Sequence, residues 1–300
     1  MKYPLNEPNI SKLEESYALD VLKSNWLSAG GKHTQVFEEL FANYLNTDHA
    51  IAVQSGTAAL HLALKAAGVI DGDNVILPNY SCGASISSVV QCGAKPIVID
   101  IELETFGLDA SRLENAIIKY QPKALQLVHV YGFPARDTMI IRDICNKYDV
   151  ILIEDSSEAL GAKIDGHSIG TIGDIGTFSL RSEKMIGIGE GGVVVTNNSS
   201  LFDKMIKLAS RSAPFRSSDS PYWEKYFYDG EGYNYRLPHL LGAVARGQIE
   251  RFPEILIQKK RVGETFRAIF KNNKHWELQS HTENSEPVYL FSYLLYQIDR

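Results

Sequence analysis

The chain has few cysteines, no large excess of basic residues and no long apolar run, and each of these absences excludes a class of protein. Its 300 residues contain three cysteines, Cys82, Cys92 and Cys145, an odd number without C-x-x-C spacing. That pattern is typical of reduced thiols rather than of a disulfide framework or a zinc site. The formal net charge of −6 argues against a nucleic-acid-binding surface, which needs clustered lysine and arginine.

Targeting and membrane segments are also missing from the pattern. The start of the chain, "MKYPLNEPNISKLEESYALD", has no apolar h-region of the kind that a secretory signal carries. No apolar run reaches the roughly 18 residues that a membrane helix needs. We therefore expect a cytoplasmic protein that binds no membrane, no nucleic acid and no metal ion.

Short apolar runs alternate with amphipathic segments from about residue 50 onward. Strands are expected at 50–53, 74–78, 95–101, 124–132, 149–155, "GTFSL" and "GGVVVT". Helices are expected at 58–68, 84–93, 109–120 (with Asp109 as its cap) and 137–148. Val/Ile/Leu-rich strands separated by helices predict an α/β fold, with a mostly parallel central sheet covered by helices on both faces.

The pattern changes toward the carboxyl end. "GYNYRLPHLLGAVARGQIERFPEILIQKKRVGETFRAIF" predicts one long broken helix, and "PVYLFSYLLYQIDR" predicts a strand. We expect a large domain at 1–250, with an N-terminal arm at 1–48, and the start of a smaller domain at 251–300.

Ligands of an open parallel sheet collect at the carboxyl ends of its strands, and three segments there carry chemistry. In "QSGTAAL", Gly56 and Thr57 open a helix, whose first amides either bind an anion or are simply capped. In "VILIEDSSEALGA", Asp155 ends a strand and is either a helix cap or a partner for a protonated ring nitrogen. In "FSLRSEKMIGIGEGG", Lys184 is either a solvated charge or a nucleophile, and Ser179 precedes it at a strand end.

The glycine run "GIGEGG" superficially resembles a dinucleotide-binding fingerprint. Such a loop follows a strand and opens a helix, whereas this one leads into "VVVT". A Rossmann-type dehydrogenase is therefore disfavoured, and the glycines are better interpreted as a turn that brings backbone close to a ligand. An anion site, a carboxylate and a lysine are together the three groups that bind pyridoxal 5′-phosphate (PLP).

At this point the chain resembles the DegT/StrS-type sugar-nucleotide aminotransferases, PLP enzymes of the aspartate-aminotransferase fold (fold type I). The likeness extends in order through "LKSNWLSAGGKHTQVFEELFANYL", "AVQSGTAALHLAL", "GDNVILPNYS", "GAKPIVIDIE", "VHVYGFPAR", "IEDSSEALGA", "GDIGTFSLRSEKMIGIGEGGVV" and "GYNYRLPHLLGAVARGQIER". Because it covers nearly the whole chain, the resemblance is far more specific than any single motif. Members usually continue beyond the point that corresponds to Arg300, so the resemblance implies a truncated small carboxyl-terminal domain, in either a fragment or a naturally short member.

The resemblance assigns roles residue by residue. Lys184 matches the lysine that forms the internal aldimine with PLP, and Asp155 matches the carboxylate that faces the pyridine nitrogen. The positions that match phosphate-binding residues are Gly56, Thr57 and Ser179, together with Asn234, which would reach the neighbouring subunit's cofactor. The resemblance therefore implies a homodimer with shared active sites.

Three cofactor-side positions differ from the family pattern. Cys82 stands where an aromatic residue often stacks on the cofactor ring, and Tyr80 is close to it in the sequence. Glu158 replaces a Gln or His near the phenolic oxygen, which a carboxylate would repel unless it is protonated or turned away. Arg181 occupies a position where His or an aromatic residue is frequent.

The implied reaction is a transamination from L-glutamate to the keto sugar of a nucleoside diphosphate sugar, most simply a 4-keto-6-deoxy sugar, for surface-polysaccharide or related amino-sugar biosynthesis. Dehydratases of the same family carry histidine in place of Lys184, so the lysine favours amino transfer. Two alternatives are an aminotransferase for a non-sugar ketone (an aminocyclitol or a small keto-phosphate) and a non-catalytic PLP-binding dimer. The sugar, the nucleotide, the carbon aminated and the stereochemistry are not encoded in these motifs.

Overall fold

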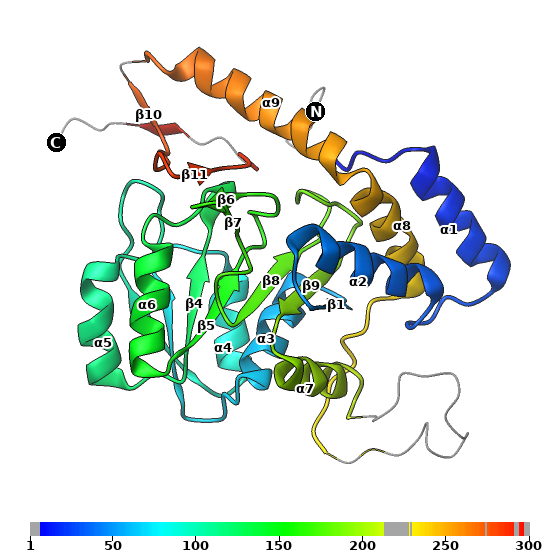
Figure 1. Cartoon of the computed structure of the whole chain (residues 1–300), viewed down its shortest axis with the longest axis horizontal. Coiled ribbons are helices and arrows are strands. Elements are labelled where there is room, and N and C mark those ends of the chain that lie inside the picture. The colour runs from blue at the N-terminus through cyan, green and yellow to red at the C-terminus, as the bar shows by residue number, and fades with distance from the viewer. Residues whose placement is uncertain (1–6, 213–227, 229, 274, 291–293, 297–300) are drawn as a thin grey trace.

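A seven-stranded sheet forms the centre of the molecule (Figure 1). The computed structural model describes residues 7–212, 228, 230–273, 275–290 and 294–296. The strand order is β1-β9-β8-β5-β4-β2-β3. The strands are β1 His49–Val53, β2 Asn74–Pro78, β3 Lys95–Ile99, β4 Ala124–Val128, β5 Ile151–Asp155, β8 Ile175–Ser179 and β9 Gly192–Thr196. Only β9 runs opposite to the others, because it pairs antiparallel with both β1 and β8 while the remaining pairs are parallel.

Helices cover both faces of the sheet (Figure 1). Alternate residues of one strand face opposite sides, so Ile51 packs in the core beneath one set of helices and Ala52 in the core beneath the other. The first set is α3 Gly56–Ala66, α4 Gly83–Gln91 and α7 Ser199–Ala209. The second set is α2 Lys32–Leu45 and α8 His239–Glu250 over β1 and β9, and α5 Leu113–Tyr120 and α6 Thr138–Tyr148 over β2, β4 and β5. The α/β architecture with a mostly parallel sheet is confirmed.

Two further helices, one near each end of the chain, lie beside the sheet and the helices that cover it. The first, α1 Lys12–Ser24, starts with a capping box in which Ser11 and Glu14 satisfy each other's backbone amides, and it packs on α8. The long helix expected after "GYNYR" is broken at Arg251, where α8 ends and α9 Phe252–Phe270 begins with a proline in its first turn. Among the described residues, no helix is both long enough and apolar enough to cross a membrane.

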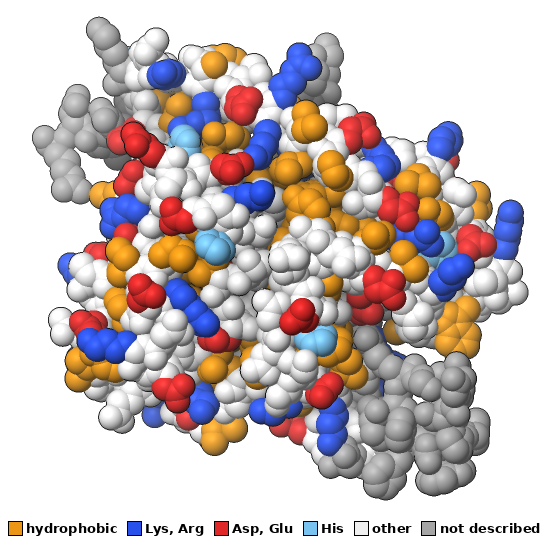
Figure 2. Space-filling model, viewed as in Figure 1, with side chains coloured by type: hydrophobic (Ala, Val, Ile, Leu, Met, Phe, Trp, Pro, Cys, Tyr) orange, Lys and Arg blue, Asp and Glu red, His pale blue; other side chains and the backbone are white. Residues whose placement is uncertain are grey.

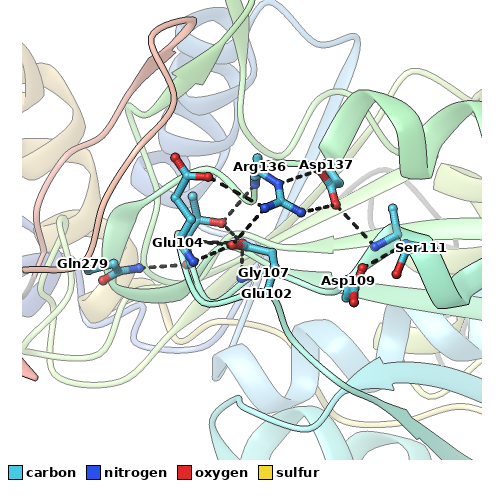
Figure 3. Close-up of polar contacts among 10 residues, drawn as sticks. Glu102, Glu104, Gly107, Asp109, Ser111, Arg136, Asp137 and Gln279 are labelled. Atoms are coloured by element: carbon cyan, nitrogen blue, oxygen red, sulfur yellow. Dashed lines mark hydrogen bonds and ion pairs between the residues drawn. The ribbon is translucent and has the colours of Figure 1, made fainter. Parts of the chain in front are cut away.

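The segment that follows α9 folds back onto the large sheet's loops. It contains β10 Trp276–Leu278, β11 Ser285–Glu286 and β12 Leu294–Tyr296, and β11 extends the small β-sheet of β6 Lys163–Ile164 and β7 His167–Ser168. Figure 3 shows Gln279 of this segment beside the turn at 102–107, where its side-chain amide donates to the carbonyl of Thr105 at 2.8 Å. Arg136 joins the same turn through the hydroxyl of Thr105, which accepts its backbone N–H at 3.0 Å (Figure 3).

Several expected elements differ at their ends: the strand expected at 95–101 stops at Ile99, and the strand expected at 149–155 begins at Ile151. Asp109 caps the amide of Ser111 as expected, but a 3₁₀ turn, Ala110–Arg112, precedes the α-helix there. The strand expected to run to residue 132 stops at Val128, because Val130–Gly132 forms a 3₁₀ turn with Tyr131 at a φ of 59°. Of the expected final strand at 287–300, residues 294–296 form β12, residues 287–290 form no strand, and 291–293 and 297–300 lie outside the described residues.

Charged side chains of both signs are interspersed over the face shown in Figure 2. No broad basic surface gathers on that face, in keeping with the net charge of the sequence.

Candidate active site

A pocket of about 300 Å³ lies where the carboxyl ends of the sheet strands meet. The loops after β1, β2, β4, β5 and β8 all contribute to it, as expected for an open parallel sheet. Its lining includes seven of the eight residues that the sequence singled out: Gly56, Thr57, Cys82, Asp155, Glu158, Ser179 and Lys184. Asn234 is exposed and lies outside this lining.

One side of the pocket is an anion cradle formed by the start of α3. Ser55 is the N-cap, and its hydroxyl accepts the N–H of Ala58 at 3.1 Å. The amides of Gly56 and Thr57 precede that bond in a first turn that has no intrahelical acceptors, so they remain free to bind an anion. A Cβ added at Gly56 would lie 2.8 Å from the Cβ of Ser179, so glycine allows the Ser179 side chain to approach this turn.

The end of β5 separates two carboxylates onto opposite faces of the sheet. Glu154 is fully buried and accepts the amides of Ile172 at 2.7 Å and Gly173 at 2.6 Å. Burial opposes its charge, but the hydrogen bond from His129 and the backbone amides outweigh that cost and lower the pKa of Glu154. Glu154 is therefore a structural carboxylate, and Asp155 is the one that faces the pocket.

Asp155 is oriented by two hydrogen bonds. The hydroxyl of Ser85, on α4, donates to Oδ2 at 3.0 Å, and the backbone amide of Ser157 donates to Oδ1 at 3.2 Å. The hydroxyl of Ser88 donates to the Ser85 carbonyl at 2.8 Å, and the amide of Gln126 donates to Ser88 at 2.9 Å. Asp155 is only 4% exposed, so these contacts fix the carboxylate at the inner wall.

Lys184 and Glu158 form an ion pair inside the pocket. The Lys184 Nζ donates to Oε1 of Glu158 at 2.9 Å, and both side chains are mostly buried. The other carboxylate oxygen accepts the backbone N–H of Tyr131 at 2.7 Å. Both carboxylate oxygens of Glu158 thus accept a hydrogen bond, so the unexpected carboxylate points toward the Lys184 amine and the Tyr131 amide.

The glycine-rich segment after β8 holds Lys184 in a tight turn. Lys184 donates its backbone N–H to the Arg181 carbonyl at 2.9 Å, and Ser182 donates to the Gly189 carbonyl at 3.1 Å. A Cβ at Gly187 would lie 2.5 Å from the Ser182 carbonyl oxygen, so this position requires glycine. The run leads into β9 and opens no helix, which agrees with a turn rather than a dinucleotide loop.

The outer wall of the pocket is partly aromatic. The hydroxyls of Tyr80 and Tyr131 lie 2.6 Å apart, and both side chains line the pocket. Cys82 is an exposed thiol at the N-cap of α4. Arg181 lies at the rim, 62% exposed, and pairs with Glu183 at 3.2 Å and with Glu190 at 3.6 Å.

Sequence reasoning did not identify three residues that act on this site. Ser85 supports Asp155, Tyr131 supplies an amide and a hydroxyl, and Lys259 on α9 donates to the backbone carbonyl of Lys184 at 3.0 Å. None of them belongs to a motif with a fixed spacing. The left-handed backbone of Tyr131 and the approach of α9 are tertiary features that no local pattern encodes.

These residues fit PLP, the group that the resemblance implies. The cradle made possible by Gly56 offers unpaired amides and the Ser179 hydroxyl to a phosphate. The oriented carboxylate of Asp155 suits a protonated ring nitrogen, and the amine of Lys184 lies in the same pocket. The pocket volume, about 300 Å³, is at the small end of the range for ligand sites.

The sequence of this chain matches a known protein family and several known proteins. The model of the DegT/DnrJ/EryC1/StrS aminotransferase family matches residues 8–299. The GDP-perosamine synthase of Vibrio cholerae is 37% identical over 265 residues, which cover 88% of this chain and 70% of that protein. The GDP-perosamine synthase of Escherichia coli O157:H7 is 34% identical over 292 residues, covering 97% of this chain and 77% of that protein.

A solved structure supports the same grouping. The crystal structure of a GDP-4-keto-6-deoxymannose-3-dehydratase with a trapped PLP-glutamate geminal diamine superposes with a TM-score of 0.90 at 25% identity. The match covers 99% of this chain and 80% of that chain. The similarity therefore extends over the whole arrangement of sheet, helices and pocket loops.

Proposed function

Because this chain belongs to the DegT/DnrJ/EryC1/StrS family of PLP-dependent aminotransferases, we propose that its pocket transfers an amino group from L-glutamate to the keto carbon of a GDP-linked 4-keto-6-deoxy sugar. The two curated relatives compared above are GDP-perosamine synthases, and the solved structure compared above is named for a GDP-4-keto-6-deoxy sugar. The observation that carries the proposal is the meeting of Lys184, Asp155 and the α3 anion cradle in one pocket.

Each residue has a distinct task in this proposal. PLP, when bound, supplies an electron sink for the amino transfer. The amides of Gly56 and Thr57 and the hydroxyl of Ser179 would hold its phosphate, and Asp155 would keep its ring nitrogen protonated. The Nζ of Lys184 would move the proton of the substrate carbon, as general base and then as general acid.

The Glu158 carboxylate would hold the Lys184 amine in the pocket while no cofactor is attached to it. Its 2.9 Å contact keeps the amine on the side of the pocket bounded by Tyr131 and away from bulk water. The walls near it include apolar groups from Ala84, Val128 and Val130, which limit the access of water to a proton in transfer.

Amino transfer and dehydration are distinguished in this proposal by the side chain at position 184. A lysine amine can be displaced and return in each cycle, whereas the family's dehydratases carry histidine at this position. The presence of Lys184 therefore supports amino transfer, although one of the solved structures that resemble this chain is a dehydratase.

The surroundings of the reaction are part of the same proposal. The exposed Asn234 lies on the segment that forms a bridge with Ser210 and is available to the pocket of a second copy, which supports a homodimer with shared sites. Soluble nucleotide sugars and glutamate are cytoplasmic metabolites, so the proposal places the enzyme in the cytoplasm.

A substrate panel tests the proposed function. The purified chain with PLP and glutamate is supplied with GDP-linked, UDP-linked and dTDP-linked 4-keto-6-deoxy sugars and with a keto-inositol, and the products are identified by mass spectrometry. We expect an amino sugar from the GDP-linked substrate at the highest kcat/KM. Preferential amination of the keto-inositol, or loss of a hydroxyl without nitrogen gain, would contradict the proposal.

A further inference from the structure

The carbonyl of the pocket lysine is held from outside the pocket by a second lysine. Lys259 on α9 donates its ammonium to the backbone oxygen of Lys184 at 3.0 Å. The two residues are 75 positions apart, so helix α9 reaches the Lys184 turn through this hydrogen bond. Within the described part of the chain, the carbonyl oxygen of Lys184 is the hydrogen-bond partner of the Lys259 ammonium.

Helix α9 packs closely against the rest of the protein one turn before and one turn after Lys259, and this packing fixes the position of the Lys259 backbone. One turn earlier, Leu256 lies so close to Gly161 that a Cβ there would meet its methyl carbons at 3.1 Å. One turn later, a Cβ at Gly263 would lie 2.3 Å from the Cβ of Tyr289. The helix backbone is therefore held against the body before and after Lys259, so the hydrogen bond ties the Lys184 turn to a fixed helix.

The position is costly for a cation, because a buried ammonium loses its hydration. Burial lowers the pKa of Lys259 to about 8. A leucine or methionine would fill the same space without that penalty, so stability alone does not favour lysine here. The gain lies in the charge-assisted hydrogen bond to the carbonyl of Lys184.

We propose that Lys259 is a positioning residue for the pocket amine: its ammonium anchors the backbone of Lys184 to α9 and so aims the Lys184 side chain into the pocket. This inference rests on the proposed function, because it gives Lys184 the reactive role. It adds that α9, the helix leading to the carboxyl-terminal segment, is coupled to the reacting group.

Hydrogen exchange of the full chain without added PLP tests the anchor itself. In Lys259→Met, the amides of 181–187 should exchange about tenfold faster than in the wild type, because the charge-assisted hydrogen bond no longer opposes local opening. Lys259→Arg, which keeps a cationic donor, should restore the exchange to within about twofold. Lys260→Met is the matched control, since Lys260 pairs with Glu286 at 3.9 Å and does not contact Lys184.

The rate of PLP addition to the cofactor-free chain, followed by absorbance, tests the consequence. We expect a decrease of about tenfold in Lys259→Met, recovery in Lys259→Arg and no change in Lys260→Met. Lys259→Gln, which keeps a neutral donor, provides a second variant if Lys259→Met does not fold, and it should fall between wild type and Lys259→Met.

The inference would be overturned by unchanged exchange and PLP addition in Lys259→Met, or by the same losses in Lys260→Met. Failure of Lys259→Arg to recover either property would overturn it as well. If the wild-type chain does not take up PLP at all, the proposed function is wrong, while the exchange comparison still decides the anchor separately.

Discussion

The amine of Lys184 lies 2.9 Å from one oxygen of Glu158, while the other oxygen of that carboxylate accepts the backbone N–H of Tyr131 at 2.7 Å. A carboxylate near the phenolic oxygen of PLP is unfavourable on charge alone. Here the protein directs it toward a cation and an amide instead. Glu158 thus links Lys184 to the turn that follows strand β4.

Replacing Glu158 by Gln should speed the addition of PLP to the cofactor-free chain by roughly threefold to tenfold. The Gln carbonyl still accepts from Tyr131, but the Lys184 amine no longer has to leave an ion pair worth about 1 kcal/mol. Stopped-flow absorbance measures the rate, and Glu183→Gln is the control because Glu183 lines the same pocket but pairs with Arg181. Equal acceleration in both variants would show that overall charge, rather than this pair, sets the rate.

Replacing Gly56 by Ala should weaken PLP binding by at least about tenfold. The added methyl would meet Ser179 at 2.8 Å and separate the two sides of the anion cradle. Gly83→Ala is a matched control, because Gly83 also opens a helix beside the pocket but has no atom within 4 Å of the added carbon. Equilibrium titration of PLP measures both; equal affinities in the two variants would place the phosphate elsewhere.

Cys82 should be the thiol that reacts with a disulfide reagent in the native protein. It is exposed, whereas burial raises the pKa of Cys92 to about 11 and that of Cys145 to about 12. Saturating PLP should slow the reaction at least about fivefold, because Cys82 lines the pocket. Peptide mapping identifies the labelled thiol, and full reactivity in the presence of bound PLP would place the cofactor away from Cys82.

The stability of the wild type relative to Lys259→Met should rise as the pH increases from about 8 toward 10.5. The folded pKa of Lys259 is about 8 and its ordinary value is 10.5, so in this window the unfolded chain binds more protons and higher pH favours folding. Below about pH 8 the variant avoids the cost of a buried charge and should be more stable, by on the order of 1–2 kcal/mol after the lost hydrogen bond is counted. Urea unfolding across this range measures the difference, and a pH-independent gap would mean that Lys259 is solvated.

Much of the fold follows from local patterns. Buried strands such as "NVILP" and "VILIED" carry continuous apolar runs, and the glycines expected to stop helices, Gly68 and Gly93, follow the ends of α3 and α4 at positive φ. Ligands bind at the carboxyl ends of parallel strands, and this rule also predicted the grouping of Gly56, Asp155 and Lys184 in one pocket. Where the sequence placed a strand through residue 132, the left-handed backbone at Tyr131 ends it early, and a non-glycine residue gives no local indication of such a conformation.

The residues that support the site, Ser85 and Lys259, could not be identified from the sequence, because each acts through a contact between elements that are far apart in the chain. Ser85 is 70 residues from Asp155, and Lys259 is 75 from Lys184. Each belongs to a helix whose local sequence would be satisfied by many other residues. The separation of Glu154 from Asp155 follows from the two-residue period of a strand, but which of the two faces the pocket depends on the packing of the sheet.

Covalent capture of PLP tests the central claim most directly. The chain is incubated with PLP, reduced with borohydride and digested, and the modified peptide is sequenced by mass spectrometry, with Lys184→Arg treated in parallel. We expect one PLP per chain on Lys184, none on the variant, and loss of capture when glutamate is added before reduction. Stoichiometric capture on another amine, Lys259 included, or equal capture by Lys184→Arg would contradict the assignment of Lys184 as the reactive residue.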